Sequence, residues 1–457
     1  MSPFSGSMKY GHATGSPVAV VEARDKYQAL DEALEKSEFF SFLRKQEIKT
    51  GKEKSGLRIA VKPNLMMFVS GKEMDVVTDP QLVEHLLMRL KAEGYTNAFP
   101  VESRNVYSNW YENRTVEQVA LAAGYKSQFV DLSRSAAVIY DSPFMGAHKI
   151  SAELYHVDVL VSFAKSKTHI ASLVTLGIKN CFGLTWEQDK YAAYHARWGA
   201  SVNHALMAVI TNPDFPFVKN AAIFTIIDAW TSLDGFLGFK SAEWEIRNSC
   251  RFLGYGSFCG TPIPLPKTLK FNLGARRETG TIIAGEDLMR VERIAMIKMG
   301  VDEGLRKVNF PYWLMAKTFG EPEVHQIPLR GGEKNAGREL LPYDRPDRRF
   351  YSIGYSGLTH TWVFDFFIPW STKIFEHFYV FINIASSWAP VDVDAFPRKN
   401  YFKTKGDDLF AIAFPTRRLV GLFLKSVKVM VNNIRLLPHK STYRNIRNFL
   451  FRSLPPG

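Results

Sequence analysis

Three side chains in the middle of the chain have the chemistry of a catalytic site: His169, Lys179 and His195. Imidazole groups transfer protons near neutral pH and bind metal ions. A lysine binds phosphate or carboxylate groups, and its amine becomes a nucleophile where burial lowers its pKa. A single histidine is more often structural than catalytic, so the prediction of a catalytic site depends on these three residues meeting in one cleft.

Polar side chains also follow the segments that are predicted to form buried strands. The apolar run at 159–163 predicts one such strand, and runs at 57–61, 98–101 and 222–227 predict three more. In open α/β sheets, ligands bind at the carboxyl ends of the strands. We therefore predict that a substrate or another anion is bound by Lys62, Asn64, Glu102, Arg104, Lys165, Lys167, Thr168 and Asn180.

A metal ion is a further candidate ligand of this edge. Asp228 follows the last of these predicted strands and, together with His195, is the candidate for binding it. Simpler roles stay open for several of the candidate residues. Lys62 and Asn64 also fit a solvated turn, and Glu102 and Asp228 also fit solvated strand ends.

These side chains must be positioned by strands and helices that alternate along the chain. Further strands are predicted at 18–21, 129–132, 137–140 and 279–284. Helices are predicted at 26–45, 115–123, 149–156, 201–210 and 289–299, and one more begins at Thr78-Asp79-Pro80 and ends at Gly94. This alternation predicts the α/β class, with a doubly wound, mostly parallel sheet that has helices on both faces.

The chain of 457 residues is long enough for more than one domain. We expect a flexible lead at 1–16, an α/β core at 17–328, a linker at 329–350 and an aromatic, basic C-terminal region at 351–457. Within the last region, the sequence predicts a basic amphipathic helix at 417–437. Such a helix either docks on the core or lies in a membrane interface, so peripheral membrane contact through 361–437 is one of two alternatives.

The composition narrows the class of protein. A net charge of +13 favours anionic partners, but no nucleic-acid-binding motif is present, so a nucleic-acid partner is not expected. Three scattered cysteines form neither a disulfide framework nor a metal-binding pair, which indicates a reducing cytoplasm. We find no secretory signal, no apolar window of membrane-spanning length, and no zinc, Walker or dinucleotide motif.

A series of short motifs resembles the domain of unknown function 362 (DUF362) family over about residues 57–300. The motifs are Val61-Lys62-Pro63-Asn64, Thr78-Asp79-Pro80, Val101-Glu102-Ser103, Lys165-Ser166-Lys167-Thr168-His169, Lys179-Asn180-Cys181-Phe182-Gly183, Ile227-Asp228 and Ile283-Ala284-Gly285-Glu286-Asp287. Many members of that family carry a ferredoxin-like iron–sulfur segment, which this sequence lacks. The resemblance therefore implies that any cluster would come from an iron–sulfur or redox partner protein. Glu292 stands where the family usually has an aspartate.

The spacing of His169, Lys179 and His195 is also similar to that of the nickel-pincer lactate racemases. That resemblance implies that His169 is an acid or base, that Lys179 tethers a pyridinium dithioacid cofactor, and that His195 binds nickel. A hydride would then move from the α-carbon of a hydroxy acid to the cofactor. Two features differ from those racemases: residues 102–105 contain no histidine, and residues 176–178 read Leu-Gly-Ile where the racemases have Gly-Gly-Arg.

We therefore expect an enzyme that acts on an anionic small molecule, either a hydroxy acid or a lipid-like acid, at the carboxyl edge of the sheet. Its chemistry would be proton or hydride transfer, with a metal or a tethered nickel-pincer-like nucleotide as cofactor. Without a second histidine, redox chemistry or one-sided epimerisation fits as well as racemisation. The alternative is a peripheral membrane or partner-binding protein that uses the α/β core as a scaffold. Both expectations place the protein in the cytoplasm, the second at a membrane surface.

Overall fold

The fold is described from a computed structural model of the chain. The structure describes residues 10, 15–66, 71–104, 115–143, 146–169, 173–186, 202–234, 257–258, 261–262, 275–301 and 310–331. His195, the helix predicted at 417–437 and the membrane contact predicted through 361–437 lie outside the described residues. Those three predictions therefore stay predictions.

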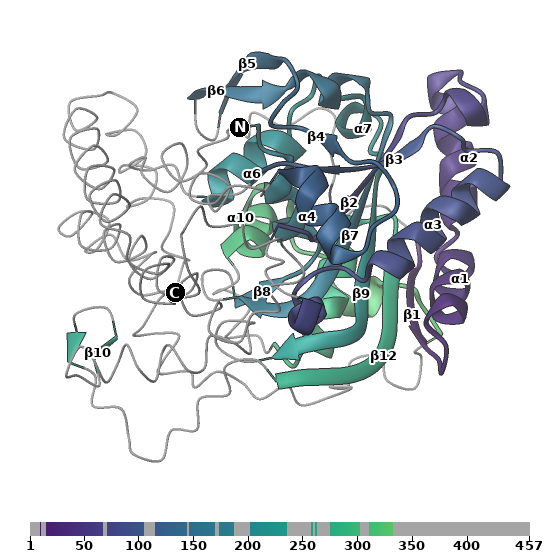
Figure 1. Cartoon of the computed structure of the whole chain (residues 1–457), viewed down its shortest axis with the longest axis vertical. Helices are drawn as coiled ribbons and strands as arrows, with labels where there is room; N and C mark the ends of the chain where they lie inside the picture. Colours follow the sequence, from purple (N-terminus) through teal and green to yellow (C-terminus); the bar gives the residue numbers. More distant parts are fainter. Residues whose placement is uncertain are drawn as a thin grey trace, which may run out of the picture.

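A single mixed sheet of nine strands organises the described part of the chain (Figure 1). Eight strands run in the order β13-β1-β12-β9-β7-β2-β3-β4, and β8 pairs with β7. Their bounds are β1 Val18–Glu22, β2 Ile59–Pro63, β3 Ala98–Glu102, β4 Val130–Asp131, β7 Val159–His169, β8 Leu173–Thr175, β9 Ile223–Asp234, β12 Ala275–Gly285 and β13 Leu329–Arg330.

The four strands from β9 through β7 and β2 to β3 run parallel, and β4 continues them. β12 is antiparallel to both of its neighbours, β9 and β1. The predicted α/β class with a mostly parallel sheet is therefore confirmed. The strand predicted at 279–284 is part of β12, which runs antiparallel to β9 and so accounts for the mixed character of the sheet.

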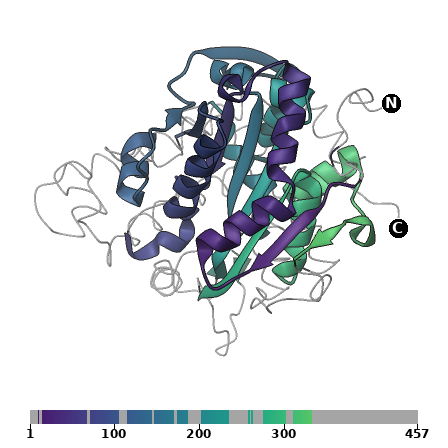
Figure 2. The same cartoon turned by 90° about the vertical axis from the view of Figure 1, so that its right-hand side faces the viewer.

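Helices cover both faces of this sheet (Figures 1 and 2). One face carries α1 Lys26–Lys36, α2 Phe39–Thr50 and α3 Pro80–Ala92, and the other carries α5 Gly177–Asn180, α6 Val202–Ile210, α9 Leu288–Lys298 and α10 Phe310–Phe319. The remaining helices are α4 Val116–Ala123, α7 Pro216–Lys219 and the 3-10 turns η1 Lys54–Gly56, η2 Gly71–Val76, η4 Ala152–His156, η5 Cys181–Leu184 and η8 Val324–Gln326. Two short hairpins lie outside the sheet: β5 Ala137–Ser142 with β6 Gly146–Ser151, and β10 Ser257–Phe258 with β11 Thr261–Pro262.

The single helix predicted at 26–45 is wrong, because the chain turns between α1 and α2. Glu38 has a left-handed backbone with φ of 59°, which ends the first helical segment and redirects the second. After this turn, Phe39 and Phe42 pack their rings on Phe224 of β9, with ring centroids 4.6 and 5.3 Å away. Both segments keep their apolar residues toward the sheet, so the hydrophobic pattern alone reads as one continuous helix.

The helix predicted at 149–156 is wrong in its first part. Residues up to Ser151 form β6, and only 152–156 form a 3-10 turn, which Ser151 caps by accepting from the Glu153 N–H. His148 and Ile150 are buried while Lys149 is exposed, which is the alternation of a strand.

Two predicted helix starts are confirmed in detail. Asp79 caps α3 by accepting from the Gln81 N–H, and proline occupies the first turn, where its missing N–H matters least. Thr115 and Gln118 form the predicted capping box of α4.

None of the helices in the described part of the chain has the length and apolar character that crossing a membrane requires. The first two residues of the predicted linker, 329–330, form strand β13.

Candidate functional site

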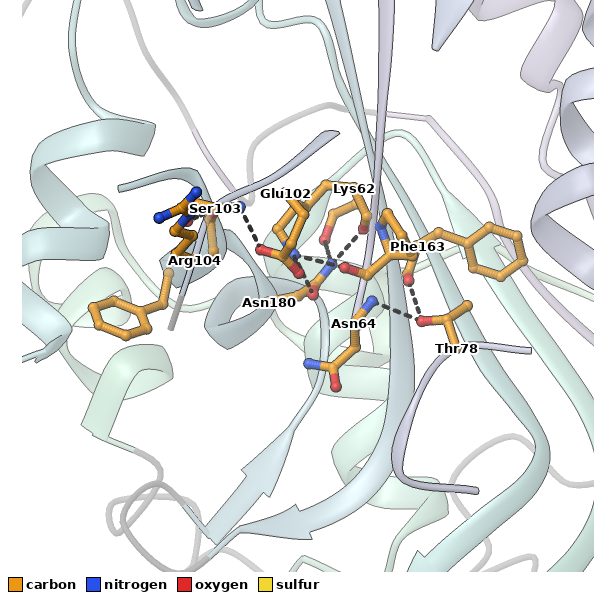
Figure 3. A network of polar contacts seen from close by, with 12 residues as sticks. Lys62, Asn64, Thr78, Glu102, Ser103, Arg104, Phe163 and Asn180 are labelled. Carbon is orange, nitrogen blue, oxygen red and sulfur yellow. Dashed lines mark hydrogen bonds and ion pairs between the residues drawn. The ribbon is translucent and has the colours of Figure 1, made fainter. Parts of the chain in front are cut away.

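A buried ion pair joins the carboxyl ends of β2 and β3. Lys62 Nζ lies 2.8 Å from Glu102 Oε2, and the two side chains are 2% and 3% exposed (Figure 3). The same ammonium donates to the Pro63 carbonyl at 2.6 Å and to Asn180 Oδ1 at 3.4 Å. Burying one charge without its partner costs free energy, so removing either Lys62 or Glu102 should destabilise the fold.

The Lys-Asn-Cys-Phe-Gly segment at 179–183 packs directly against this ion pair. Asn180 Nδ2 donates to the Lys62 carbonyl at 2.6 Å and to Ser162 Oγ at 3.1 Å. The Gly183 carbonyl accepts from Ser103 Oγ at 2.5 Å. A Cβ atom on Gly183 would lie 2.5 Å from Lys62 Nζ, which leaves no room for any side chain there. The asparagine and the glycine are therefore needed for close contact with the ion pair.

A second buried ion pair lies on β7 and β9. Lys165 Nζ is 3.0 Å from Asp228 Oδ2 and 3.2 Å from Thr231 Oγ1. Asp228 also accepts backbone N–H groups, from Asp79 at 2.8 Å and from Trp230 at 3.1 Å. The strand predicted at 159–163 in fact continues to His169, so Lys165 lies inside the strand and pairs in register with Asp228.

Two more lysines at this edge have no carboxylate partner among the described residues. Lys167 is buried on β7, and its ammonium donates to the Val76 carbonyl at 2.7 Å. Burial, together with the charges of Lys179 and Lys165, holds the pKa of Lys167 well below its ordinary value. Lys179 lies partly buried on α5, and burial and the charge of Lys62 lower its pKa to about 8. These two amines are therefore the ones at this edge that a bound anion could pair with.

Removing the charge of Lys179 should stabilise the fold. Its lowered pKa means that the unfolded chain holds this proton more tightly than the folded chain does. The wild type should therefore gain stability as pH rises from about 8 toward the ordinary value of 10.5. At pH 7, Lys179→Met should raise the free energy of unfolding by about 1 to 3 kcal/mol, a range reduced for the partial exposure of the amine.

Urea unfolding at pH 7 and at pH 10 checks this, and the advantage of the variant should shrink at the higher pH. Lys45→Met, at a lysine whose side chain is 57% exposed, is the control and should change stability little. A loss of stability in Lys179→Met at pH 7 would contradict the expectation.

The remaining predicted binding residues are not all brought to the ion pairs. Arg104 pairs with Asp131 at the end of β4, with Nε 3.4 Å from Oδ2. The Asn64 N–H donates to Thr78 Oγ1 at 2.8 Å, and its side-chain amide projects away from Lys62 (Figure 3). The Asn64 Oδ1 atom is buried without a hydrogen-bond partner among the described residues. Thr168 is buried on β7.

The described residues place the predicted metal and acid/base groups only in part. His169 is the last residue of β7, where its backbone pairs with Leu173. Each oxygen of Asp228 already accepts at least one hydrogen bond from a protein donor. Among the described residues, no group of three or more histidine, cysteine, aspartate and glutamate side chains is arranged to hold a metal ion. The acid/base role of His169 and the ligand role of His195 stay predictions.

Three residues that the sequence did not single out for function position the site. Thr78 is buried and donates to the Phe163 carbonyl at 2.7 Å, which links the start of α3 to β7. Ser162 donates to the Gly177 carbonyl at 3.0 Å and also accepts from Asn180. Glu292 of α9 accepts the Ile178 N–H at 3.0 Å. A serine inside the apolar run 159–163 is the signal that could have pointed to Ser162, because a buried hydroxyl needs partners.

Residues 59–246 match the protein family described as "Domain of unknown function (DUF362)". The matched range contains every candidate site residue named from the sequence, and the predicted family is therefore confirmed over it. Glu292 lies beyond the matched range. No curated protein and no solved structure matches the chain.

Proposed function

We propose that this chain, which carries a DUF362 family region at residues 59–246, is an enzyme that acts on an anionic small molecule at the carboxyl edge of its parallel strands. A hydroxy acid or a lipid-like acid is the proposed substrate class, and the proposed reaction moves a proton or a hydride. One observation carries this proposal. Lys62 and Lys165 have buried carboxylate partners, whereas Lys167 and Lys179 have none among the described residues.

An anion would relieve the electrostatic cost of this arrangement. Burial and the charges of Lys179 and Lys165 lower the pKa of Lys167, and burial and the charge of Lys62 lower the pKa of Lys179. A bound carboxylate near both amines would favour their protonated forms, and the binding free energy would include this gain. The charges of Lys62 and Lys165 are already offset by Glu102 and Asp228. We therefore assign Lys62 and Lys165 a structural role at this edge of the sheet, and we assign direct contact with the anion to Lys167 and Lys179.

The reacting groups would come from the same edge. His169 follows Lys167 by two residues on β7, which supports its proposed role as the acid or base. A metal or a nucleotide cofactor tethered to Lys179 would supply a hydride acceptor when bound. The amine of Lys179 fits a covalent tether, because it is partly exposed and makes no ion pair with a described carboxylate. Lys62, Asn180 and Glu292 hold the backbone that carries it.

Ligand-induced stabilisation tests the binding site. We expect L-lactate or decanoate to raise the melting temperature of the full chain, by an amount that grows with the logarithm of ligand concentration above the dissociation constant. Lys179→Met should weaken that binding by at least about tenfold, equivalent to about 1.4 kcal/mol.

Lys298→Met is the matched control, because burial also lowers the pKa of Lys298 to about 8. It lies at the end of α9 and should leave ligand binding as in the wild type. If both substitutions weaken binding equally, the effect reflects loss of a buried amine anywhere in the protein. If neither anion changes the melting temperature, the proposed substrate class is wrong.

The alternative function, membrane or partner binding through 361–437, rests on the sequence. Flotation of the full chain with anionic liposomes, compared with a chain that ends near Tyr343, tests it. Flotation of the full chain alone would support it.

A further inference from the structure

The backbone around Lys179 is fixed on both sides. On one side, the Ile178 N–H donates to Glu292 Oε2, and the Gly177 carbonyl accepts from Ser162 Oγ. On the other side, Asn180 is anchored by its side-chain hydrogen bonds to Lys62 and Ser162. The position of the Lys179 amine is therefore limited mainly by its own side-chain rotamers.

Gly177 adds a second constraint to the same turn. A Cβ atom there would lie 2.6 Å from Thr225 Cγ2 and 3.0 Å from Leu288 Cδ1, so α5 packs directly on β9 and α9. The helix that carries Lys179 cannot move toward the sheet. Its backbone is also fixed to α9 by the hydrogen bond from the Ile178 N–H to Glu292. A reactive group needs this kind of support to approach a ligand in a defined geometry.

The four lysines at this edge differ in what occupies their amines. Lys62 and Lys165 are bound in buried ion pairs with Glu102 and Asp228. Lys167 is buried and donates to a backbone carbonyl. Lys179 is partly exposed and has no described carboxylate partner, so its amine is the best placed of the four to attack a bound molecule.

We propose that the Lys179 amine forms an imine with the carbonyl carbon of an oxo acid whose carboxylate is bound beside Lys167. This inference rests on the proposed anion site and adds a carbonyl group to the definition of its ligand. It concerns the oxidised counterpart of a hydroxy acid, and it requires no cofactor.

The reaction balances without an oxidant or a reductant. The lone pair on Lys179 Nζ attacks the carbonyl carbon, which forms a C–N bond and places a proton on the former carbonyl oxygen. A second proton makes that oxygen a leaving water, and the C–O bond breaks as the C=N bond forms. The product is a protonated imine beside the carboxylate of the ligand, so the ligand's charge is offset by the iminium and by Lys167. Such an iminium draws electrons from the adjacent carbon.

The protonation state of the amine supports this chemistry. A lysine attacks a carbonyl only in its neutral form, and the pKa of Lys179, lowered to about 8 by burial and by Lys62, makes that form accessible near neutral pH. Adduct formation should therefore increase as pH rises through about 8.

Reductive trapping of the full chain tests the proposal. The protein is incubated separately with pyruvate, acetoacetate and 2-oxoglutarate, each with sodium cyanoborohydride, and then analysed by intact mass and peptide mapping. We expect at least one of these acids to give a single saturable adduct on Lys179. Acetone, which has the carbonyl but no carboxylate, should label this lysine at least tenfold more slowly than acetoacetate does. Lys179→Arg should lose the adduct, and Lys298→Arg should keep it.

Three outcomes would overturn the imine. Labelling of Lys298 as fast as Lys179 would mean that low basicity alone explains the reaction. A covalent group already present on Lys179 before any addition would mean that the amine is committed to a cofactor. If the oxo acids protect the protein against thermal unfolding but form no adduct, the anion site is supported and the imine is contradicted. If the oxo acids neither bind nor form an adduct, and L-lactate and decanoate also fail to bind, both the imine and the proposed function are wrong.

Discussion

Glu102→Ala is expected to lower the free energy of unfolding by about 3 to 5 kcal/mol, because it leaves the ammonium of Lys62 buried without a counter-charge. Lys62 is 2% exposed, and its remaining hydrogen-bond acceptors are an amide oxygen and a carbonyl oxygen, which cannot replace a carboxylate. Urea unfolding at pH 7, followed by far-UV circular dichroism, measures the effect.

Glu32→Ala is the matched control for this substitution. Glu32 also pairs with a lysine, Lys36, but the two side chains are 35% and 36% exposed and lie one helical turn apart on α1. Its loss should cost about 0.5 kcal/mol or less. Replacing both members of the buried pair, as Lys62→Met with Glu102→Leu, should recover much of the stability lost in Glu102→Ala. Equal effects of Glu102→Ala and Glu32→Ala would show that the pair at β2 and β3 is not buried as described.

Gly183→Ala is expected to be the most disruptive small substitution in the Lys-Asn-Cys-Phe-Gly segment. The added methyl group would overlap with the Lys62 side chain and with Glu102 Oε1, and Lys62 cannot move aside without leaving Glu102. Overpacking of this kind costs about 1 to 3 kcal/mol, and the cost rises if the ion pair separates. The same variant should weaken ligand binding, because Lys179 in α5 and Gly183 in η5 lie on consecutive turns of the chain.

A double-substitution experiment shows whether Gly183 acts through the ion pair. If it does, the combined effect of Gly183→Ala and Glu102→Ala on stability is smaller than the sum of the two separate effects. Gly56→Ala serves as the control, because a Cβ atom there would meet its nearest neighbour, Lys52 Cβ, at an ordinary 3.9 Å. Full additivity would mean that the glycine is required for some other reason.

Local sequence features were sufficient to predict much of the fold. The capping residues of α3 and α4 bond to N–H groups in the first turn of their own helices. Because these contacts are local, the helix starts can be predicted from the sequence without knowledge of the tertiary structure. The apolar runs at 57–61 and 98–101 become adjacent parallel strands, as the alternation of strands and helices indicates. The idea that charged residues gather at one edge followed from this arrangement, and it holds for Lys62, Glu102 and Lys165.

The partners within the site could not be predicted, because they depend on contacts between distant segments. Glu102 lies 40 residues from Lys62 in sequence, and Asp228 lies 63 residues from Lys165. No local pattern specifies which carboxylate meets which lysine. The antiparallel direction of β12 could not be predicted for a related reason, since a strand has the same apolar pattern whether it runs parallel or antiparallel.

The position of β1 between β12 and β13 couples the first described strand to the last ones. β1 lies between β12 and β13, where Val18 pairs with both Gly285 and Leu329. On the ribosome, β1 therefore emerges long before either neighbour exists, and the sheet is completed only after about 330 residues have been made. Until Gly285 has been made, β9 has an open edge where β12 will later pair, and this unpaired edge is a surface on which a nascent chain could aggregate.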